Sequence, residues 1–158
     1  MILEILSNDI TGSEPTNLQD AQIYFRSEDS DGIEDDLIES LLKQAREAIE
    51  KTVNISLIER TIKVYVNEYV GYLPYGPIDP DSLTKISGEI EIRGKAYPYC
   101  YWGEDATVEY HCLAYQSEDL INAIYELASF WYFRGDSDRS LPDKIKPVIK
   151  RNTRNTFA

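Results

Sequence analysis

Hydrophobic residues in the N-terminal half of the chain recur every three or four positions, which is the spacing of one face of an α-helix. The clearest series extends from residue 33 to about residue 52, and its members are Ile33, Leu37, Leu41, Ala45, Ala48 and Ile49. The opposite face should meet solvent or a partner, and it carries Glu39, Lys43, Arg46, Glu47 and Glu50. Asp31 is placed to cap this helix. A shorter helix, capped by Thr16 or Asn17, should precede it and carry apolar residues up to Phe25.

From about Ile55 the hydrophobic positions fall on every second residue, which predicts β-strands. Three segments alternate in this way. Their apolar positions are Ile58, Ile62, Val64 and Val66, then Ile86, Ile90 and Ile92, then Val108, Tyr110 and Cys112. Turn-forming residues separate the segments, so we expect an antiparallel sheet. The first 15 residues should form an arm or a short strand, because an apolar start is followed by the turn-rich Thr11–Pro15.

Two more helices are predicted near the C-terminal end. Ser117 should cap a long helix that ends at Gly135. Its apolar stripe consists of Leu120, Ile121, Ile124, Leu127, Ala128, Trp131 and Tyr132. Pro142 suits the first turn of a final helix, but Pro147 would break a continuous one, so that helix should begin near Pro147 and be short. The predicted fold class is α+β, a small bundle of about four helices with an antiparallel β-sheet inserted between the second and third helices.

These elements fit a single domain, because 158 residues with 42% hydrophobic content can bury a core. We expect an N-terminal arm at residues 1–15, two helices at 16–53, a β insertion at 55–115, the long helix at 117–135, and a short helix with a C-terminal tail at 141–158. No apolar run approaches the ~20 residues of a membrane span, and residues 1–4 lack the features of a signal peptide. We therefore expect a soluble protein without membrane contact.

The net charge of −12 is unevenly distributed. Residues 1–142 carry 11 Lys and Arg against 27 Asp and Glu, whereas residues 143–158 carry five against one. An acidic body repels the phosphate backbone, which argues against wrapping or reading nucleic acid. The basic tail is suited to an acidic surface, although a tail of this kind can also be a solvated chain end.

Few residues suggest catalysis or metal binding. His111, the only histidine, is expected on the polar face of a strand without a nucleophile motif beside it. The stretch Asp29–Gly32 is similar to part of a calcium loop, but Ser27 and Ile38 would occupy the first and twelfth ligand positions, and neither can serve as required. We therefore predict no catalytic, metal-binding or cofactor-binding residues, no cofactor and no enzyme activity.

Cysteine and tyrosine are placed without an obvious chemical role. A turn at residues 103–106 would set Cys100 opposite Glu109 rather than Cys112, so two free thiols are favoured over a disulfide. Nine of the 12 tyrosines lie between Tyr65 and Tyr115. Stacking on bases or sugars is one interpretation. A half-buried sheet face or a subunit interface is favoured, because no cluster of Lys or Arg accompanies the tyrosines.

Several motifs along the chain are similar, in order, to those of one family. They are NLQDAQIYFR at residues 17–26, DLIESLLKQAREAIE at 36–50, Leu73-Pro-x-x-Pro77 with Ser82-Leu-x-x-Ile86, YELASFWYFR at 125–134, and Leu141-Pro142. Together they cover most of the chain and resemble the head-tail connector (adaptor) proteins of tailed bacteriophages and prophages. The first two and the fourth resemble the first three helices of that family, and the third resembles the segment before its central strand.

The resemblance implies a structural virion protein without chemistry of its own. Proteins of this family form a ring, commonly of twelve copies, beneath the portal vertex of a filled phage head. The ring extends the DNA channel, through which DNA passes without sequence-specific binding, and presents a docking surface for the next neck or tail protein. The implied location is the virion neck, after synthesis in the bacterial host cytoplasm. A stopper or tail-completion protein is an alternative in the same assembly, and an acidic inhibitor that mimics DNA is an alternative of another class.

The charge pattern adds a mechanism to what the resemblance implies. An acidic ring lumen would repel the DNA and let it slide. The basic tail would reach into the portal protein as a charged and aromatic anchor, through Lys150, Arg151, Arg154 and Phe157. Exchange of the three basic residues for Glu is then expected to abolish portal attachment and leave the fold intact.

Overall fold

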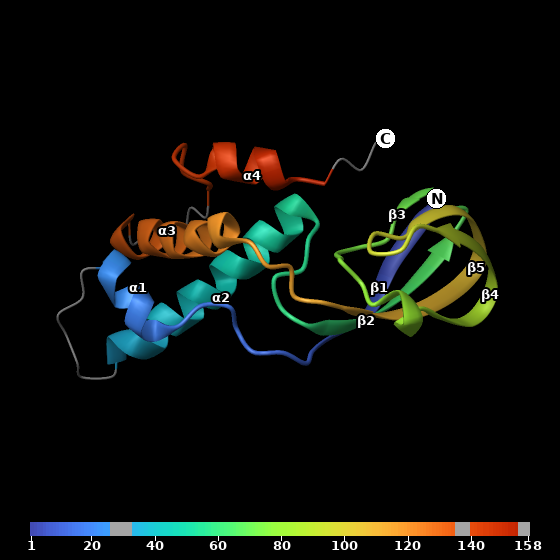
Figure 1. Ribbon diagram of the computed structural model, residues 1–158, viewed down its shortest axis with the longest axis horizontal. Helices are drawn as coiled ribbons and strands as arrows, with labels where there is room; N and C mark the ends of the chain where they lie inside the picture. The colour runs from blue at the N-terminus through green and yellow to red at the C-terminus, as the bar shows by residue number, and fades with distance from the viewer. Residues whose placement is uncertain (26–32, 135–139, 155–158) are drawn as a thin grey trace. The chain divides into compact units, whose positions relative to one another are not determined.

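The computed structural model describes residues 1–25, 33–134 and 140–154, with only the backbone at residues 33 and 34. In this part of the chain four helices accompany one antiparallel sheet, so the predicted α+β class is confirmed (Figure 1). The residues form two compact units. We call them the β unit (residues 1–13, 54–115 and the chain from 154) and the helical unit (residues 14–53 and 116–153). None of the described helices is long and apolar enough to cross a membrane.

The helical unit is built from four helices that pack on one another (Figure 1). They are α1 (Leu18–Phe25), α2 (Ile33–Val53), α3 (Glu118–Arg134) and α4 (Lys146–Asn152). The side chain of Asn17 accepts a hydrogen bond from the backbone of Asp20 at 2.8 Å, and Ser117 caps α3 through Leu120 at 3.2 Å. Pro147 lies in the first turn of α4, as predicted for a short final helix. The predicted caps Asp31 and Gly135 lie outside the described residues.

The buried face of α2 differs from the predicted one. Its buried apolar residues are Ile38, Leu41, Leu42, Ala45, Ile49 and Val53. Leu37, predicted to lie in the core, has 49% of its surface exposed. Leu37 and Ile38 each begin a series with three- and four-residue steps, and the series from Ile38 collects more large apolar side chains. That series is the one that the packing of α2 against α3 buries.

Two charged residues of α2 that were predicted to meet solvent or a partner are buried instead. Arg46 and Glu50 are each 1% exposed. The Arg46 guanidinium contacts both carboxylate oxygens of Glu14, at 2.6 and 2.9 Å, and also donates to Glu50. Burial by itself lowers the pKa of Arg46, but the two carboxylates outweigh it, so the pKa is raised from its ordinary value. The ion pairs compensate the loss of hydration that accompanies burial. The spacing of hydrophobic residues alone did not predict that these two charged side chains are buried.

The β unit contains one antiparallel sheet in which β1, β2, β5 and β3 are neighbours in that order and β4 pairs with β5. The strands are β1 (Ile2–Ile10), β2 (Arg60–Asn67), β3 (Gly71–Tyr72), β4 (Thr84–Arg93) and β5 (Tyr99–Cys112). Figure 1 shows them in a strongly curved sheet. A short 3₁₀ helix at Pro80–Ser82 precedes β4. The buried cluster of this unit includes Ile62, Val64, Val66, Val108, Tyr110 and Cys112, as the alternation predicted.

The N-terminal segment is a strand in the sheet. β1 pairs with β2 along its length, with Ile5 opposite Val64, and a bulge follows Ile5. Of the two predicted forms, an arm or a short strand, the pairing with β2 selects the strand. Several apolar side chains of β1 stay partly exposed because the strand lies at an edge of the sheet, and they are Ile2, Ile5, Leu6 and Ile10.

The turn predicted at residues 103–106 is wrong, because β5 continues through them. Cys100 and Cys112 therefore lie on one strand, and both are buried and outside any disulfide, as predicted. β4 pairs with β5 on either side of Gly88, which has φ +75°. A Cβ at Gly88 would lie 2.1 Å from the carbonyl oxygen of Asp105. The register shifts around Gly88 leave Ile86 51% exposed, although it was predicted to lie on the inner face.

Candidate docking surfaces

The described residues offer no evident catalytic centre. Within them, no group of three or more His, Cys, Asp and Glu side chains is placed to hold a metal ion. His111 is half-buried on its strand, and its Nδ1 lies 3.3 Å from the hydroxyl of Thr61 on the neighbouring strand. This cross-strand contact accounts for the imidazole without a reacting partner.

The basic tail is the first candidate docking surface. Ile145 and Ile149 are buried and hold α4 in the helical unit. Lys150 is exposed on the outer side of the helix. The side chain of Arg151 is 62% exposed and contacts Asp119 at 2.7 Å. Such an exposed ion pair is weak and can be exchanged for a partner's carboxylate. Phe157 lies outside the described residues.

Arg154, predicted to act together with Lys150 and Arg151, is placed differently. It belongs to the β unit and is partly buried there. Its Nη2 donates to the carbonyl oxygen of Leu73 at 3.0 Å, and its Cζ lies 4.7 Å from the ring centre of Tyr97 and 5.1 Å from that of Tyr72. Burial lowers the pKa of Arg154 from its ordinary value. The predicted anchor set is thus divided between the two units.

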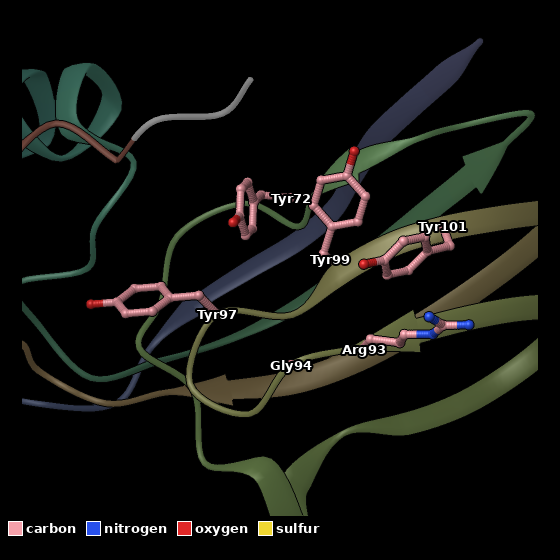
Figure 2. A pocket seen from close by; sticks show the side chains of 6 residues that line it. All are labelled: Tyr72, Arg93, Gly94, Tyr97, Tyr99 and Tyr101. Carbon is pink, nitrogen blue, oxygen red and sulfur yellow. The ribbon is translucent and has the colours of Figure 1, made fainter. Parts of the chain in front are cut away.

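A hollow of about 300 Å³ in the β unit is the second surface. It is lined by Tyr72, Arg93, Gly94, Tyr97, Tyr99 and Tyr101 (Figure 2). Tyr99 is paired with Tyr72 on β3 and with Arg93 on β4, and Tyr101 follows two residues later, so these side chains share one face of the sheet. The ring of Tyr99 meets those of Tyr72 and Tyr101 edge to face, each at 4.9 Å.

The chemistry of the hollow is aromatic, with one cation at its edge. The guanidinium of Arg93 lies 4.5 Å from the ring centre of Tyr101 and 2.7 Å from the carboxylate of Glu91. Burial raises the pKa of Tyr97 above its ordinary value. Partly exposed tyrosine rings of this kind suit cationic side chains, proline or other aromatic rings of a protein partner. The sequence showed the abundance of tyrosine, but only the pairing of strands shows which of them gather.

A second hollow, of about 380 Å³, lies in the helical unit at the end of α3. Phe130, Phe133 and Pro142 supply its apolar lining, and Phe133 is 62% exposed. Lys144 and Glu126 at its edge form an ion pair at 3.0 Å. An exposed aromatic side chain beside a hollow is typical of a protein contact surface rather than of a core.

No protein-family model matches this sequence, and no curated protein matches it either. Solved structures do share its fold. A chain from the neck of an empty gene transfer agent (GTA) particle, computed with C6 symmetry, matches with a TM-score of 0.66 and 19% identity, over 100% of this chain and 98% of that chain. A chain from the virion of a native GTA particle matches with a TM-score of 0.65 and 18% identity, over 100% and 97%. A chain from the neck of the native particle, computed with C12 symmetry, matches with a TM-score of 0.59 and 17% identity, over 100% and 98%. At these identities the similarity establishes a common fold.

Proposed function

We propose that this chain is a structural protein of the neck of a phage-like particle, and that it joins the portal vertex of the head to the tail. The observation that carries the proposal is the match of the whole chain to chains from particle necks. The motifs of the connector family, in order along the sequence, support the same function. On this proposal the protein acts by binding alone, within the virion.

The proposed assembly is a homo-oligomeric ring, and the symmetric necks that contain chains of this fold support it. We propose twelve copies around the DNA channel, with the portal protein on one side and the next neck or tail protein on the other. The acidic body would line a channel that conducts DNA without binding it. Because one matching neck was computed with C6 symmetry, a six-copy ring in another neck position, such as a stopper or tail-completion protein, is the second candidate.

The first test is the mass of the purified protein by native mass spectrometry, alone and mixed with the portal protein from the same genome. We expect a ring of about twelve copies, or a monomer that adds to the portal in that number. Six copies would favour the second candidate. A stable monomer or dimer that does not bind the portal protein would overturn the proposal and favour the DNA-mimic alternative.

The second test concerns the basic tail, for which Lys150 and Arg151 are the exposed candidates. The double variant K150E/R151E should lose portal binding in a pull-down, because it reverses two charges without touching the packing of either unit. The double variant K43E/K51E is the matched control, since both lysines are exposed on α2 and the change in net charge is the same. Equal binding of the two variants would contradict a role of the tail. Arg154 is left unchanged in this test. Its replacement would also break contacts within the β unit, so an effect on portal binding would not be separable from an effect on stability.

A further inference from the structure

Arg154 lies in a site whose backbone is held in place by hydrogen bonds. Leu73, whose carbonyl accepts from Arg154, is fully buried, and its own N–H donates to Pro98 at 3.0 Å. The next carbonyl, of Pro74, accepts from the hydroxyl of Tyr110 at 2.8 Å. The backbone around Leu73 is thus fixed on two sides, and its carbonyl is held in position for the guanidinium.

The aromatic walls of this site are also fixed. Tyr97 packs over Gly76, where φ is +114° and a Cβ would lie 2.8 Å from the ring. Tyr72 is held edge to face against Tyr99. The two rings stand within the distance at which a cation is attracted by the π face. A larger residue at position 76 would displace the ring of Tyr97, so the absence of a side chain there contributes to the site.

The chemistry of this site selects a guanidinium. A planar guanidinium can lie against ring faces while one nitrogen donates to a carbonyl, whereas an ammonium group is a compact and strongly hydrated charge. The Nε and Nη1 atoms of Arg154 are buried and have no hydrogen-bond acceptor among the described residues. The ring faces of Tyr72 and Tyr97 are therefore the electron-rich groups beside them. A lysine in this place would lose more hydration and gain less stacking.

We propose that Leu73, Tyr72 and Tyr97 form an arginine-binding slot that takes an arginine side chain of a peptide segment, and that the chain's own Arg154 fills it. Arg154 is thereby held within the β unit through its side chain. If the protein docks to a portal as proposed above, Arg154 is withheld from that partner while it lies in the slot, and Lys150 and Arg151 are the basic side chains that the tail presents. That consequence rests on the proposed function, but the slot itself does not.

Nuclear magnetic resonance of the full chain tests the slot directly. The Nε–Hε signal of Arg154 should be shifted upfield by the ring currents of Tyr72 and Tyr97, and it should return to the position of a free arginine in Tyr97→Leu. The signal of Arg151, which contacts Asp119 at the surface, is the internal control and should stay unchanged. Tyr72→Leu is the second variant if Tyr97→Leu does not fold. An Arg154 signal at the free position in the unmodified protein would overturn the proposal.

A peptide added to the full-length variant Arg154→Gln tests the specificity of the slot. The probe is KRNTRNTFA, residues 150–158 of this chain. It should bind weakly, with a Kd on the order of 1 mM, and shift the signals around Leu73. A peptide with Lys or Gln at position 154 should bind at least about tenfold more weakly, whereas a peptide with Gln at position 151 should bind like the original. Equal binding of all four peptides, or no binding of the original, would overturn the slot and leave the ring and portal experiments unaffected.

Discussion

The helical unit buries Arg46 and the β unit partly buries Arg154, and the two sites differ in their chemistry. In the helical unit Arg46 lies between the carboxylates of Glu14 and Glu50, which raise its pKa in spite of burial. In the β unit Arg154 lies against two tyrosine rings and one carbonyl, and burial lowers its pKa. The carboxylates thus offset the burial of Arg46, whereas no carboxylate among the causes of the Arg154 shift does so. We infer that Arg46 is a permanent part of its fold, whereas Arg154 can be released at smaller cost.

The largest effect should come from breaking the ion cluster of the helical unit. Arg46→Met is expected to lower the free energy of unfolding by about 3–5 kcal/mol, because the buried carboxylate of Glu50 loses the charge that compensates it. Urea denaturation followed by circular dichroism measures this change. The double variant Arg46→Met with Glu50→Leu is the control and should recover most of the loss. An equal loss in both variants would show that the packing of the arginine side chain, and not its charge, determines its contribution to the free energy of unfolding.

Alkaline pH should destabilise the β unit before it affects the helices of the helical unit. The phenol of Tyr110 is buried in the β unit, and burial raises its pKa well above 10.0. Because the folded pKa is raised, the stability from this group is present below about pH 10 and is lost as the pH rises through the folded pKa. Tyrosine signals in the near-ultraviolet should therefore change before the helical signal at high pH.

The variant Tyr110→Phe sharpens this comparison, since it removes the ionisation and keeps the ring. Its near-ultraviolet transition should move to higher pH than that of the unmodified protein, although the hydrogen bond to Pro74 is lost. Near- and far-ultraviolet circular dichroism across an alkaline titration provides both readings. A single transition at the same pH in both proteins would indicate that Tyr110 does not control the alkaline stability of the β unit.

The smallest effect is expected at a third arginine, which neither unit buries. Arg151→Gln should change the free energy of unfolding by no more than about 0.5 kcal/mol, because its ion pair with Asp119 is exposed and screened. Thermal unfolding at two salt concentrations measures it, with Asp119→Asn as the matched variant. A loss well above 1 kcal/mol would mean that this ion pair holds α4 in place.

Local signals along the sequence were sufficient for the elements of the helical unit. Caps at Asn17 and Ser117 and a proline at position 147 act within one turn of the backbone, so their effect can be predicted without knowledge of the fold. The apolar face of α2 was predicted with an error of one position at its start. Leu37 and Ile38 both suited the pattern, and the packing of α2 against α3 decided between them.

The strands were predicted less completely, because their boundaries depend on partners. The inner residues of β2 and of the end of β5 followed the alternation, but the course of β5 through residues 103–106 depends on pairing with β4 over its length. The close approach of Gly88 to the backbone of Asp105 is part of the bulged pairing of β4 with β5. The residues next to Gly88 in the sequence do not predict it.

The sequence by itself determined the class of fold, the order of its elements and the contrast between an acidic body and a basic tail. Each of these depends on periodicity, on capping or on composition, which are properties of neighbouring residues. Only the tertiary structure decided that Arg46 is buried with Glu14, 32 residues away, and that Arg154 lies against Leu73, 81 residues away. Contacts over such sequence separations form only when distant segments pack together. Which of several charged residues becomes buried therefore depends on the packing and not on the neighbouring sequence.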